Sequence, residues 1–322
     1  STHRVNRRHV GHQIRFRRFR SKTRQPKVDP SSRHLSNRVM SDARPIGFFD
    51  SGLGGLTVLT AARRQFPHEN FVYLGDTARL PYGTKSPDTI FRYTIQNIRA
   101  LCKMGVKAIV VACNSASTSI LRSRDSKEAT KILSDALTQN GKTVPLYNVI
   151  EPGADAALEA SASKRIAVLG TRATVDSKAY VHAIETRDQS AVVFQAAAPL
   201  LVPLVEEGWE GDPLTNLIVY RYLGPLLSNQ VDTLILGCTH YPALHESIRR
   251  VTGFGVQLVD SSLAIAKLLE RDFKSGLLQP HDSDRAGALD LFATDTSSSM
   301  NVTAQRLMGA PDSLDFKPFD IV

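Results

Sequence analysis

The chain has 322 residues, of which 42% are hydrophobic and 22% are charged, a composition typical of a globular protein with one large domain or two ordinary ones. No apolar run is long enough to cross a bilayer, so we expect no contact with a membrane. Three cysteines are too few for a secreted disulfide scaffold, and the N-terminus lacks the apolar stretch of a signal peptide. These features favour a cytoplasmic protein.

The net charge of +9 comes from the N-terminal segment 1–44. That segment holds 13 Lys and Arg residues against 2 acidic residues, a balance of +11, which leaves 27 basic and 29 acidic residues, or −2, in the rest of the chain. Because segment 1–44 has no helical or strand periodicity, we expect a disordered basic extension. An anionic partner such as nucleic acid is therefore conceivable only for this extension.

From residue 45 onward, short apolar strands alternate with helical patterns. Helices are expected from Leu56 to about Gln65 and from Ser86–Pro87 to Gly105, where the capping residues mark a start and a stop. Strands are expected at 45–51, 70–76, 106–114, 142–150, 165–171, 191–199, 231–239 and 255–261. Continuous apolar strands that alternate with helices indicate parallel sheets covered on both faces, the doubly wound α/β class.

One strand-end motif occurs twice along the chain. "VVACNS" and "LILGCTH" both end a strand with a small residue and a cysteine, and the two cysteines, Cys113 and Cys238, are 125 residues apart. We therefore predict two similar doubly wound domains whose mainly parallel sheets face each other across a central cleft. Ligands of open α/β sheets bind beyond the carboxyl ends of the strands, so both cysteines should project into that cleft.

Polar residues follow other strands and apolar segments in the same way. They are Asp50, Ser51, Asp76, Tyr82, Thr171, Thr174, Glu206 and Glu207. Each has an ordinary alternative explanation: the first pair and the two threonines could be helix N-caps, and the two glutamates could form a solvated turn. The glycine-rich "GLGG" lacks both the G-x-G-x-x-G pattern and the P-loop pattern, and we predict no cofactor.

The three cysteines call for different interpretations. Cys102 lies inside an expected helix and should be a buried core residue. Cys238, His240 and His245 include the residue types of a zinc site, but no C-x-x-C pair completes a set of four ligands, so we predict no metal.

Two thiols that face each other across a cleft suit one type of reaction. One thiolate removes a proton from a carbon and the other thiol returns a proton on the opposite side, which inverts the stereocentre. Asp50, Glu206 and His240 are available to manage the protons of the thiols. Without a cofactor, the carbanion would need stabilisation by hydrogen bonds and desolvation.

Five motifs occur in the order found in glutamate racemase, a cofactor-independent enzyme of the aspartate/glutamate racemase superfamily, and residues 45–310 resemble that family. The motifs are "FFDSGLGGLTVL", "YLGDTARLPYG", "ACNSAS", "VPLVEEG" and "GCTHYPAL". The resemblance implies interconversion of L- and D-glutamate that supplies D-glutamate for peptidoglycan, and a homodimer. An aspartate racemase or another member of the superfamily is the alternative.

The resemblance also implies roles for individual residues. Cys113 would remove the α-proton from D-glutamate and Cys238 would remove it from L-glutamate, while Asp50, Glu206 and His240 match the auxiliary acid/base residues. The positions that match the substrate-binding residues are Asp50, Ser51, Tyr82, Gly83, Asn114, Ser115, Thr239 and His240. The expected domains are discontinuous, with 45–140 and 248–322 in the first and 141–247 in the second.

Overall fold

The structure is a computed structural model that describes residues 41–310 and 314–321. The expected disordered extension lies outside these ranges, except for residues 41–44. Those residues belong to the folded chain, contrary to expectation, because their polar groups find partners. The Asp42 backbone N–H donates to Pro280 O at 3.0 Å, and Arg44 forms an ion pair with Asp42 at 2.6 Å.

The first sheet has six parallel strands in the order β12-β11-β2-β1-β3-β6. Their bounds are β1 (Ile46–Asp50), β2 (Phe71–Gly75), β3 (Ala108–Val111), β6 (Leu146–Asn148), β11 (Leu289–Ala293) and β12 (Phe316–Pro318). Every residue of β1, β2 and β3 is buried, as continuous apolar strands in the middle of a covered sheet should be.

The second sheet has four parallel strands in the order β10-β9-β7-β8. They are β7 (Arg165–Gly170), β8 (Val192–Ala197), β9 (Thr233–Gly237) and β10 (Gln257–Asp260). A short antiparallel pair, β4 (Thr138–Gln139) and β5 (Lys142–Thr143), stands apart from both sheets. The prediction of a doubly wound α/β fold with two parallel sheets is confirmed.

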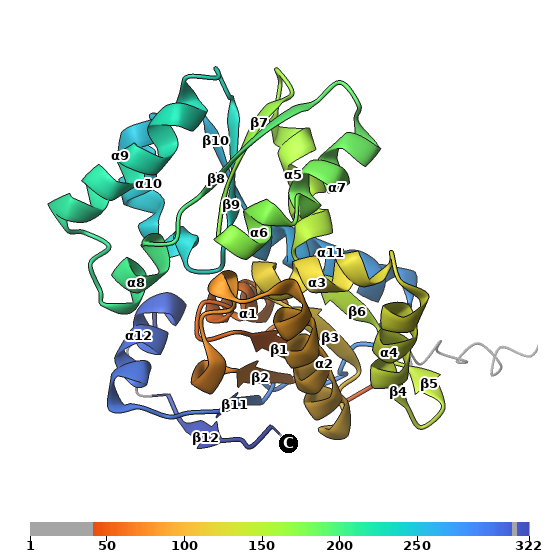
Figure 1. Cartoon of the computed structure of the whole chain (residues 1–322). Coiled ribbons are helices and arrows are strands. Elements are labelled where there is room, and N and C mark those ends of the chain that lie inside the picture. Colours follow the sequence, from red (N-terminus) through yellow and green to blue (C-terminus); the bar gives the residue numbers. More distant parts are fainter. Residues whose placement is uncertain (1–40, 311–313, 322) are drawn as a thin grey trace, which may run out of the picture. The chain divides into compact units, whose positions relative to one another are not determined.

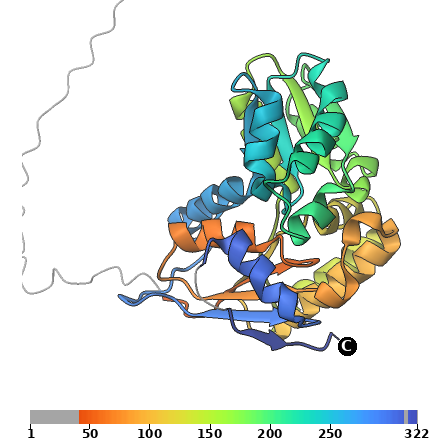
Figure 2. The same cartoon turned by 90° about the vertical axis from the view of Figure 1, so that its left-hand side faces the viewer.

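Helices cover both faces of each sheet (Figures 1 and 2). They are α1 (Leu56–Gln65), α2 (Pro87–Lys103), α3 (Asn114–Ser123), α4 (Lys127–Leu137), α5 (Ile150–Ala160), α6 (Arg172–Asp176), α7 (Ala179–Arg187), α8 (Leu201–Glu206), α9 (Pro213–Leu227), α10 (His245–Thr252), α11 (Ser261–Ser275) and α12 (Ser298–Met308). Short 3-10 turns are η2 (Thr77–Arg79), η3 (Tyr82–Thr84) and η4 (Tyr241–Leu244). Within the described residues, no helix is long and apolar enough to cross a membrane.

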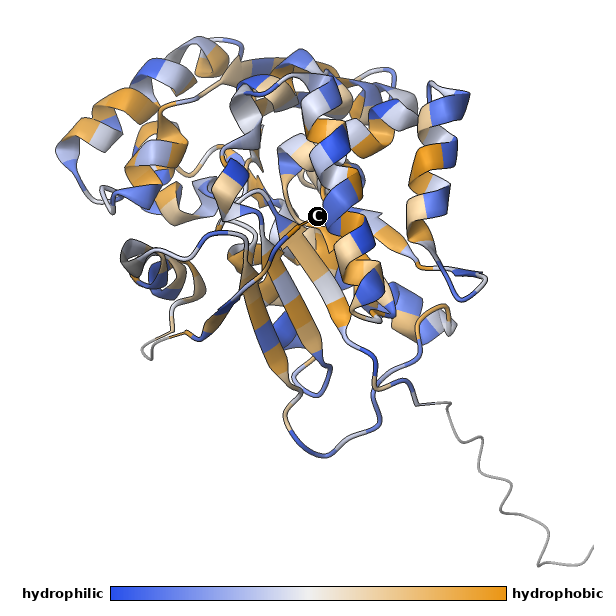
Figure 3. Ribbon diagram, turned by 60° about the horizontal axis from the view of Figure 1, so that its bottom comes forward, coloured by the Kyte–Doolittle hydropathy of each residue, from blue (hydrophilic) through white to orange (hydrophobic). Residues whose placement is uncertain are grey.

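Four apolar clusters form the core, one on each face of each sheet. Residues of α1, α11 and α12 pack on one face of the first sheet, and residues of α2, α3 and α4 pack on the other. The second sheet is covered by α8, α9 and α10 on one face and by α5 and α7 on the other. Successive residues such as Phe48 and Phe49 therefore belong to different clusters, which explains why the strands are apolar without alternation (Figure 3).

The best-marked helices were predicted closely. α1 spans the predicted Leu56–Gln65, and α2 begins after Ser86, whose side chain accepts the Thr89 backbone N–H. Gly105 follows α2 with a φ of +77°, in the left-handed region that favours glycine. The strands β11 and β12, in contrast, were not predicted.

The predicted domain boundaries differ from the sheet pairing at two strands. We placed β6 in the second domain and β10 in the first, yet β6 pairs with β3 and β10 pairs with β9. Each of these strands closes a crossover that returns the chain to the neighbouring strand of the same sheet. The division into two discontinuous domains stays a prediction, with the chain changing sheets after β6 and after β10.

Candidate active site

A small cavity lies where the carboxyl ends of strands from both sheets meet. Its volume is about 20 Å³, roughly the space needed for one water molecule. Every predicted site residue except Asp50 lines it. The lining residues are Ser51, Gly52, Leu80, Pro81, Tyr82, Gly83, Cys113, Asn114, Ser115, Thr171, Val202, Glu206, Cys238, Thr239 and His240.

The two sheets touch through the segment that follows Cys238. Thr57 of α1 donates a hydrogen bond to Thr239 O at 3.2 Å, and the Thr239 hydroxyl donates to Asp50 Oδ1 at 3.3 Å. A Cβ atom on Gly54 would lie 2.3 Å from Thr239 Oγ1 and 2.5 Å from His240 Nδ1. Close packing against the segment after Cys238 therefore explains why the loop after β1 is rich in glycine.

Cys113 ends the segment after β3 and caps the N-terminus of α3. Its Sγ accepts the Ala116 backbone N–H at 3.4 Å and lies 3.5 Å from Ser51 Oγ. Burial and the nearby Asp50 carboxylate raise the pKa of the Cys113 thiol to about 12, against the opposing effect of these hydrogen bonds. Cys113 is therefore a protonated thiol at neutral pH.

Asp50 lies beneath the cavity rather than in its lining. It is fully buried at the end of β1, and its Oδ2 accepts the Gly52 backbone N–H at 3.0 Å. Burial raises the pKa of the Asp50 carboxyl, while the positive charge of His240 and the hydrogen bonds to Asp50 lower it in part. Its alternative role as a helix N-cap is wrong, because α1 has Gly55 as its N-cap and no side-chain cap.

Cys238 shares its surroundings with an imidazole and a carboxylate. His240 Nδ1 lies 3.9 Å from Cys238 Sγ, and His240 Nε2 lies 3.2 Å from Glu206 Oε1. Burial favours the neutral imidazole, but the contacts with the Cys238 sulfur and the Glu206 carboxylate outweigh it and raise the pKa of His240 to about 10. His240 is therefore an imidazolium at neutral pH, and a cation beside a sulfur stabilises negative charge on it.

The structure rules out the solvated turn that was the alternative explanation for Glu206. It is the last residue of the short helix α8. The apolar residues of α8 pack into the core of the second sheet, which directs Glu206 toward the cavity. Glu207, the C-cap, is exposed.

Asp76 was not among the predicted site residues, although the sequence marks it as a polar residue at a strand end. It is fully buried and accepts hydrogen bonds from the hydroxyl of Tyr82, from Arg79 Nε at 2.8 Å and 2.9 Å, from Asn97 Nδ2 at 3.2 Å and from Thr294 Oγ1 at 3.1 Å. These contacts fix Tyr82, which lines the cavity.

Thr171 is a second site residue that we did not predict. It caps α6 by accepting the Thr174 backbone N–H at 3.2 Å, which confirms the capping role, and its hydroxyl also lies 2.9 Å from Ser115 Oγ in the cavity lining. On the same side, Asn114 Oδ1 accepts a hydrogen bond from the Tyr180 hydroxyl at 2.8 Å. The polar side chains of the lining are thus held from both sheets.

Cys102 and His245, the remaining residues of the cysteine and metal hypotheses, do not line the cavity. Cys102 is buried in the core formed by α2, as predicted. His245 is about half exposed at the start of α10, where it contacts Glu246 at 3.5 Å. Among residues 41–310 and 314–321, no cluster of three or more His, Cys, Asp or Glu side chains could hold a metal ion.

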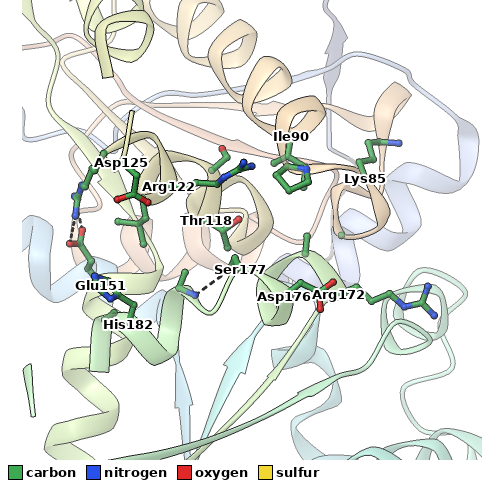
Figure 4. Close-up of a pocket in the computed structure, with 18 of the residues that line it drawn as sticks. Lys85, Ile90, Thr118, Arg122, Asp125, Glu151, Arg172, Asp176, Ser177 and His182 are labelled. Atoms are coloured by element: carbon green, nitrogen blue, oxygen red, sulfur yellow. Dashed lines mark hydrogen bonds and ion pairs between the residues drawn. The ribbon is translucent and has the colours of Figure 1, made fainter. Parts of the chain in front are cut away.

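A larger cavity of about 750 Å³ adjoins the first one. Figure 4 shows Lys85 and Arg122 on one side of it and Arg172 and Asp176 of α6 on the other. Gly83 lines both cavities, and neither cysteine of the small cavity reaches the larger one. This second cavity was not predicted from the sequence.

Comparisons with known proteins agree with this arrangement. The family model Asp/Glu/Hydantoin racemase matches residues 57–269. The glutamate racemase of Chlorobaculum tepidum is 42% identical over 230 residues, which cover 71% of this chain and 79% of that protein. The glutamate racemase of Aquifex pyrophilus is 43% identical over 264 residues, which cover 82% and 94%.

A solved structure gives the same result. The crystal structure of glutamate racemase from Francisella tularensis in complex with D-glutamate matches with a TM-score of 0.76 and 30% identity, and the match covers 87% of this chain and 98% of that one. Fold, motifs and relatives lead to one conclusion: the chain belongs to the glutamate racemases of the Asp/Glu/hydantoin racemase family, which are isomerases.

Proposed function

We propose that this chain interconverts L- and D-glutamate by proton transfer between two cysteines, without a cofactor. The observation that carries the proposal is the presence of Cys113 and Cys238 in the lining of one cavity, each at the carboxyl end of a strand from a different sheet. Thiols that approach from two sheets can reach opposite faces of one bound carbon.

From L-glutamate, the thiolate of Cys238 takes the α-proton: the Cα–H bond breaks, an S–H bond forms, and the electron pair stays on the substrate as a carbanion. Cys113 then donates its thiol proton to the opposite face of Cα, which yields D-glutamate and a Cys113 thiolate. The reverse reaction begins with that thiolate. Each cysteine thus serves as base in one direction and as acid in the other.

The surroundings of the two sulfurs support this division of roles. The raised pKa of Cys113, about 12, keeps a proton available for donation. The imidazolium of His240, paired with Glu206, would stabilise the thiolate of Cys238. Asp50 lies close enough to Cys113 to oppose its ionisation. We propose that Asp50 assists the transfer of the Cys113 thiol proton.

We assign binding of the substrate carboxylates to hydrogen-bond donors of the lining. These are the hydroxyls of Ser51 and Ser115, the Asn114 amide and the backbone at Gly83. Tyr82 and Thr239 donate their hydroxyl protons to Asp76 and Asp50, and we assign them to the wall of the same binding site. The cavity of about 20 Å³ is too small for glutamate, so the lining must widen when substrate binds. Closure around the substrate would exclude water and strengthen the electrostatic stabilisation of the carbanion.

The direct test measures the change in the circular dichroism signal over time with four substrates. They are L-glutamate, D-glutamate and both enantiomers of aspartate. We expect racemisation of glutamate in both directions and far slower turnover of aspartate, because the Chlorobaculum tepidum and Aquifex pyrophilus relatives, at 42% and 43% identity, are glutamate racemases. Cys113→Ala and Cys238→Ala should each abolish racemisation. Full activity of either variant would refute the two-cysteine mechanism, and preference for aspartate would refute the substrate.

The wider setting forms part of the same proposal. A cytoplasmic homodimer that supplies D-glutamate for peptidoglycan fits the family and the three free cysteines. The nucleic-acid alternative concerned the basic extension, and nothing in the described residues favours it.

A further inference from the structure

The C-terminal helix α12 holds the end of the short helix that carries Glu206. Arg306 Nη2 donates to Val205 O at 3.0 Å and to Glu206 O at 3.1 Å. Thr303, one turn earlier on α12, donates its hydroxyl to Glu206 O at 3.2 Å. These are carbonyls at the C-terminal end of α8, where a helix lacks internal donors and where a positive charge is favourable.

The chain after α8 leaves space for the guanidinium group of Arg306. Gly208 follows the C-cap of α8 with a φ of +78°, and a Cβ atom there would lie 2.1 Å from Arg306 Nη1. The same Nη1 contacts Glu210 Oε2 at 3.3 Å, and the Glu210 backbone is held in turn by the hydroxyl of Ser247 at 2.9 Å. Arg306 therefore occupies a fitted position at the end of α8.

The two helices belong to different sheets, although they touch (Figure 1). Met300, Ala304 and Met308 of α12 pack into a core of the first sheet, whereas the apolar residues of α8 pack into a core of the second. Leu307 packs against both clusters. A displacement of one sheet relative to the other would therefore reach α8 through α12.

We propose that Arg306, assisted by Thr303, is a positioning residue that sets the Glu206 carboxylate against His240. The proposal rests on the proposed function, because it assumes that Glu206 assists the cysteine beside His240. The geometry supports it in one step: Glu206 is bound through its backbone carbonyl by α12 and contacts His240 Nε2 through its carboxylate at 3.2 Å. A misplacement of about 1 Å at such a group costs up to a hundredfold in rate.

The test is a double-mutant cycle on kcat for glutamate racemisation. Arg306→Ala should lower kcat on the order of tenfold, and Glu206→Gln should lower it as well while leaving both thiols in place. In the Glu206→Gln background, Arg306→Ala should then change kcat by less than about twofold, because the residue it acts through is already disabled. Full additivity of the two effects would overturn the proposal.

Companion variants separate positioning from loss of structure. Arg306→Lys keeps the charge but not the planar fork and should restore part of the lost kcat, and Thr303→Val should cause a smaller loss with the same non-additivity. Gln305→Ala is the matched control on α12, since its side chain makes no hydrogen bond to any described residue, and it should leave kcat unchanged. Thermal unfolding of each variant identifies any that fold poorly.

The outcomes also distinguish this proposal from the one on which it rests. If the unmodified chain does not racemise glutamate, the proposed function fails. If it does and Arg306→Ala retains full kcat, or lowers it equally in both backgrounds, only the positioning role fails.

Discussion

Cys113 and Cys238 belong to similar sequence motifs but lie in different electrostatic surroundings. A buried carboxylate stands near Cys113, and a charged imidazole stands beside Cys238. The proposed mechanism requires one thiol and one thiolate at the start of each turnover, and the raised pKa of Cys113, about 12, supplies the thiol. In the reverse direction, the proton must first be redistributed between the two sides.

The His240–Glu206 contact predicts a pH dependence. Because the pKa of His240 is raised to about 10, its imidazolium persists at neutral pH and is lost as the pH rises through about 10. We expect kcat/KM for L-glutamate to fall over that range. In Glu206→Gln the fall should begin at lower pH, because the carboxylate that favours the imidazolium is gone.

The substrate's own ammonium group titrates identically in both enzymes, so the difference between their profiles reports the protein. Glu207→Gln removes the neighbouring exposed carboxylate and should leave the profile unchanged. Superimposable profiles for Glu206→Gln and the unmodified chain would show that this contact does not set the charge of His240.

At the scale of elements, the loop after β2 depends on one buried carboxylate. Asp76 receives hydrogen bonds from four side chains, which belong to the loop itself, to α2 and to the segment after β11. A single group thus joins three elements and presents Tyr82 to the cavity. Loss of its charge should disturb both stability and catalysis.

We therefore predict that Asp76→Asn lowers the free energy of unfolding by about 1 to 3 kcal/mol, because buried donors lose a charged acceptor. It should also lower kcat/KM for glutamate on the order of tenfold, since Tyr82 loses its fixed orientation. Urea unfolding and the racemisation assay measure the two effects. Unchanged kcat/KM in a destabilised variant would limit Asp76 to a structural role.

Sequence reasoning succeeded for elements with local signals. The cap at Ser86 and the glycine at 105 locate α2, and continuous apolar runs locate the central strands. It failed for β12, whose three residues are stabilised by pairing with β11 rather than by a pattern of their own. The sheet membership of β6 and β10 also depends on long-range pairing, which no local pattern records.

The candidate site divides in a similar way. Strand-end motifs locate both cysteines, Asp50 and His240, because the chain order of the motifs follows the strands. They do not reveal that Asp50 lies beneath the cavity or that Thr171 belongs to the lining. Those facts depend on how the two sheets approach each other.

At the scale of the whole molecule, the end of the first sheet opposite the cavity is held by a buried ion pair. Lys107, before β3, donates to Glu69 Oε2 at 2.6 Å, to Asp42 O at 2.9 Å and to Gln279 O at 2.8 Å. The two charged side chains are only 2% and 6% exposed. This cluster joins the segments before β1, β2 and β3 to the segment after α11.

Lys107→Met should lower the free energy of unfolding by about 3 to 5 kcal/mol, because it leaves the Glu69 carboxylate buried without its cation. Lys131→Met breaks an exposed pair with Asp135 and should cost no more than about 1 kcal/mol. Chemical denaturation compares the two. Because the cluster lies at the amino ends of the strands, kcat/KM should change less than twofold, and a large catalytic defect in folded Lys107→Met would contradict this separation.

The central claim, that two cysteines transfer protons on opposite faces of one carbon, is tested most directly by racemisation in deuterium oxide. Early in the reaction of L-glutamate, we expect every molecule of D-glutamate formed to carry deuterium at the α-carbon, because Cys113 exchanges its proton with solvent before donating it. The remaining L-glutamate should keep its original hydrogen, because the proton taken by Cys238 is not returned to the same face. Product that retains the substrate hydrogen, or deuterium that accumulates equally in the remaining substrate, would show that one base serves both faces and would contradict the account.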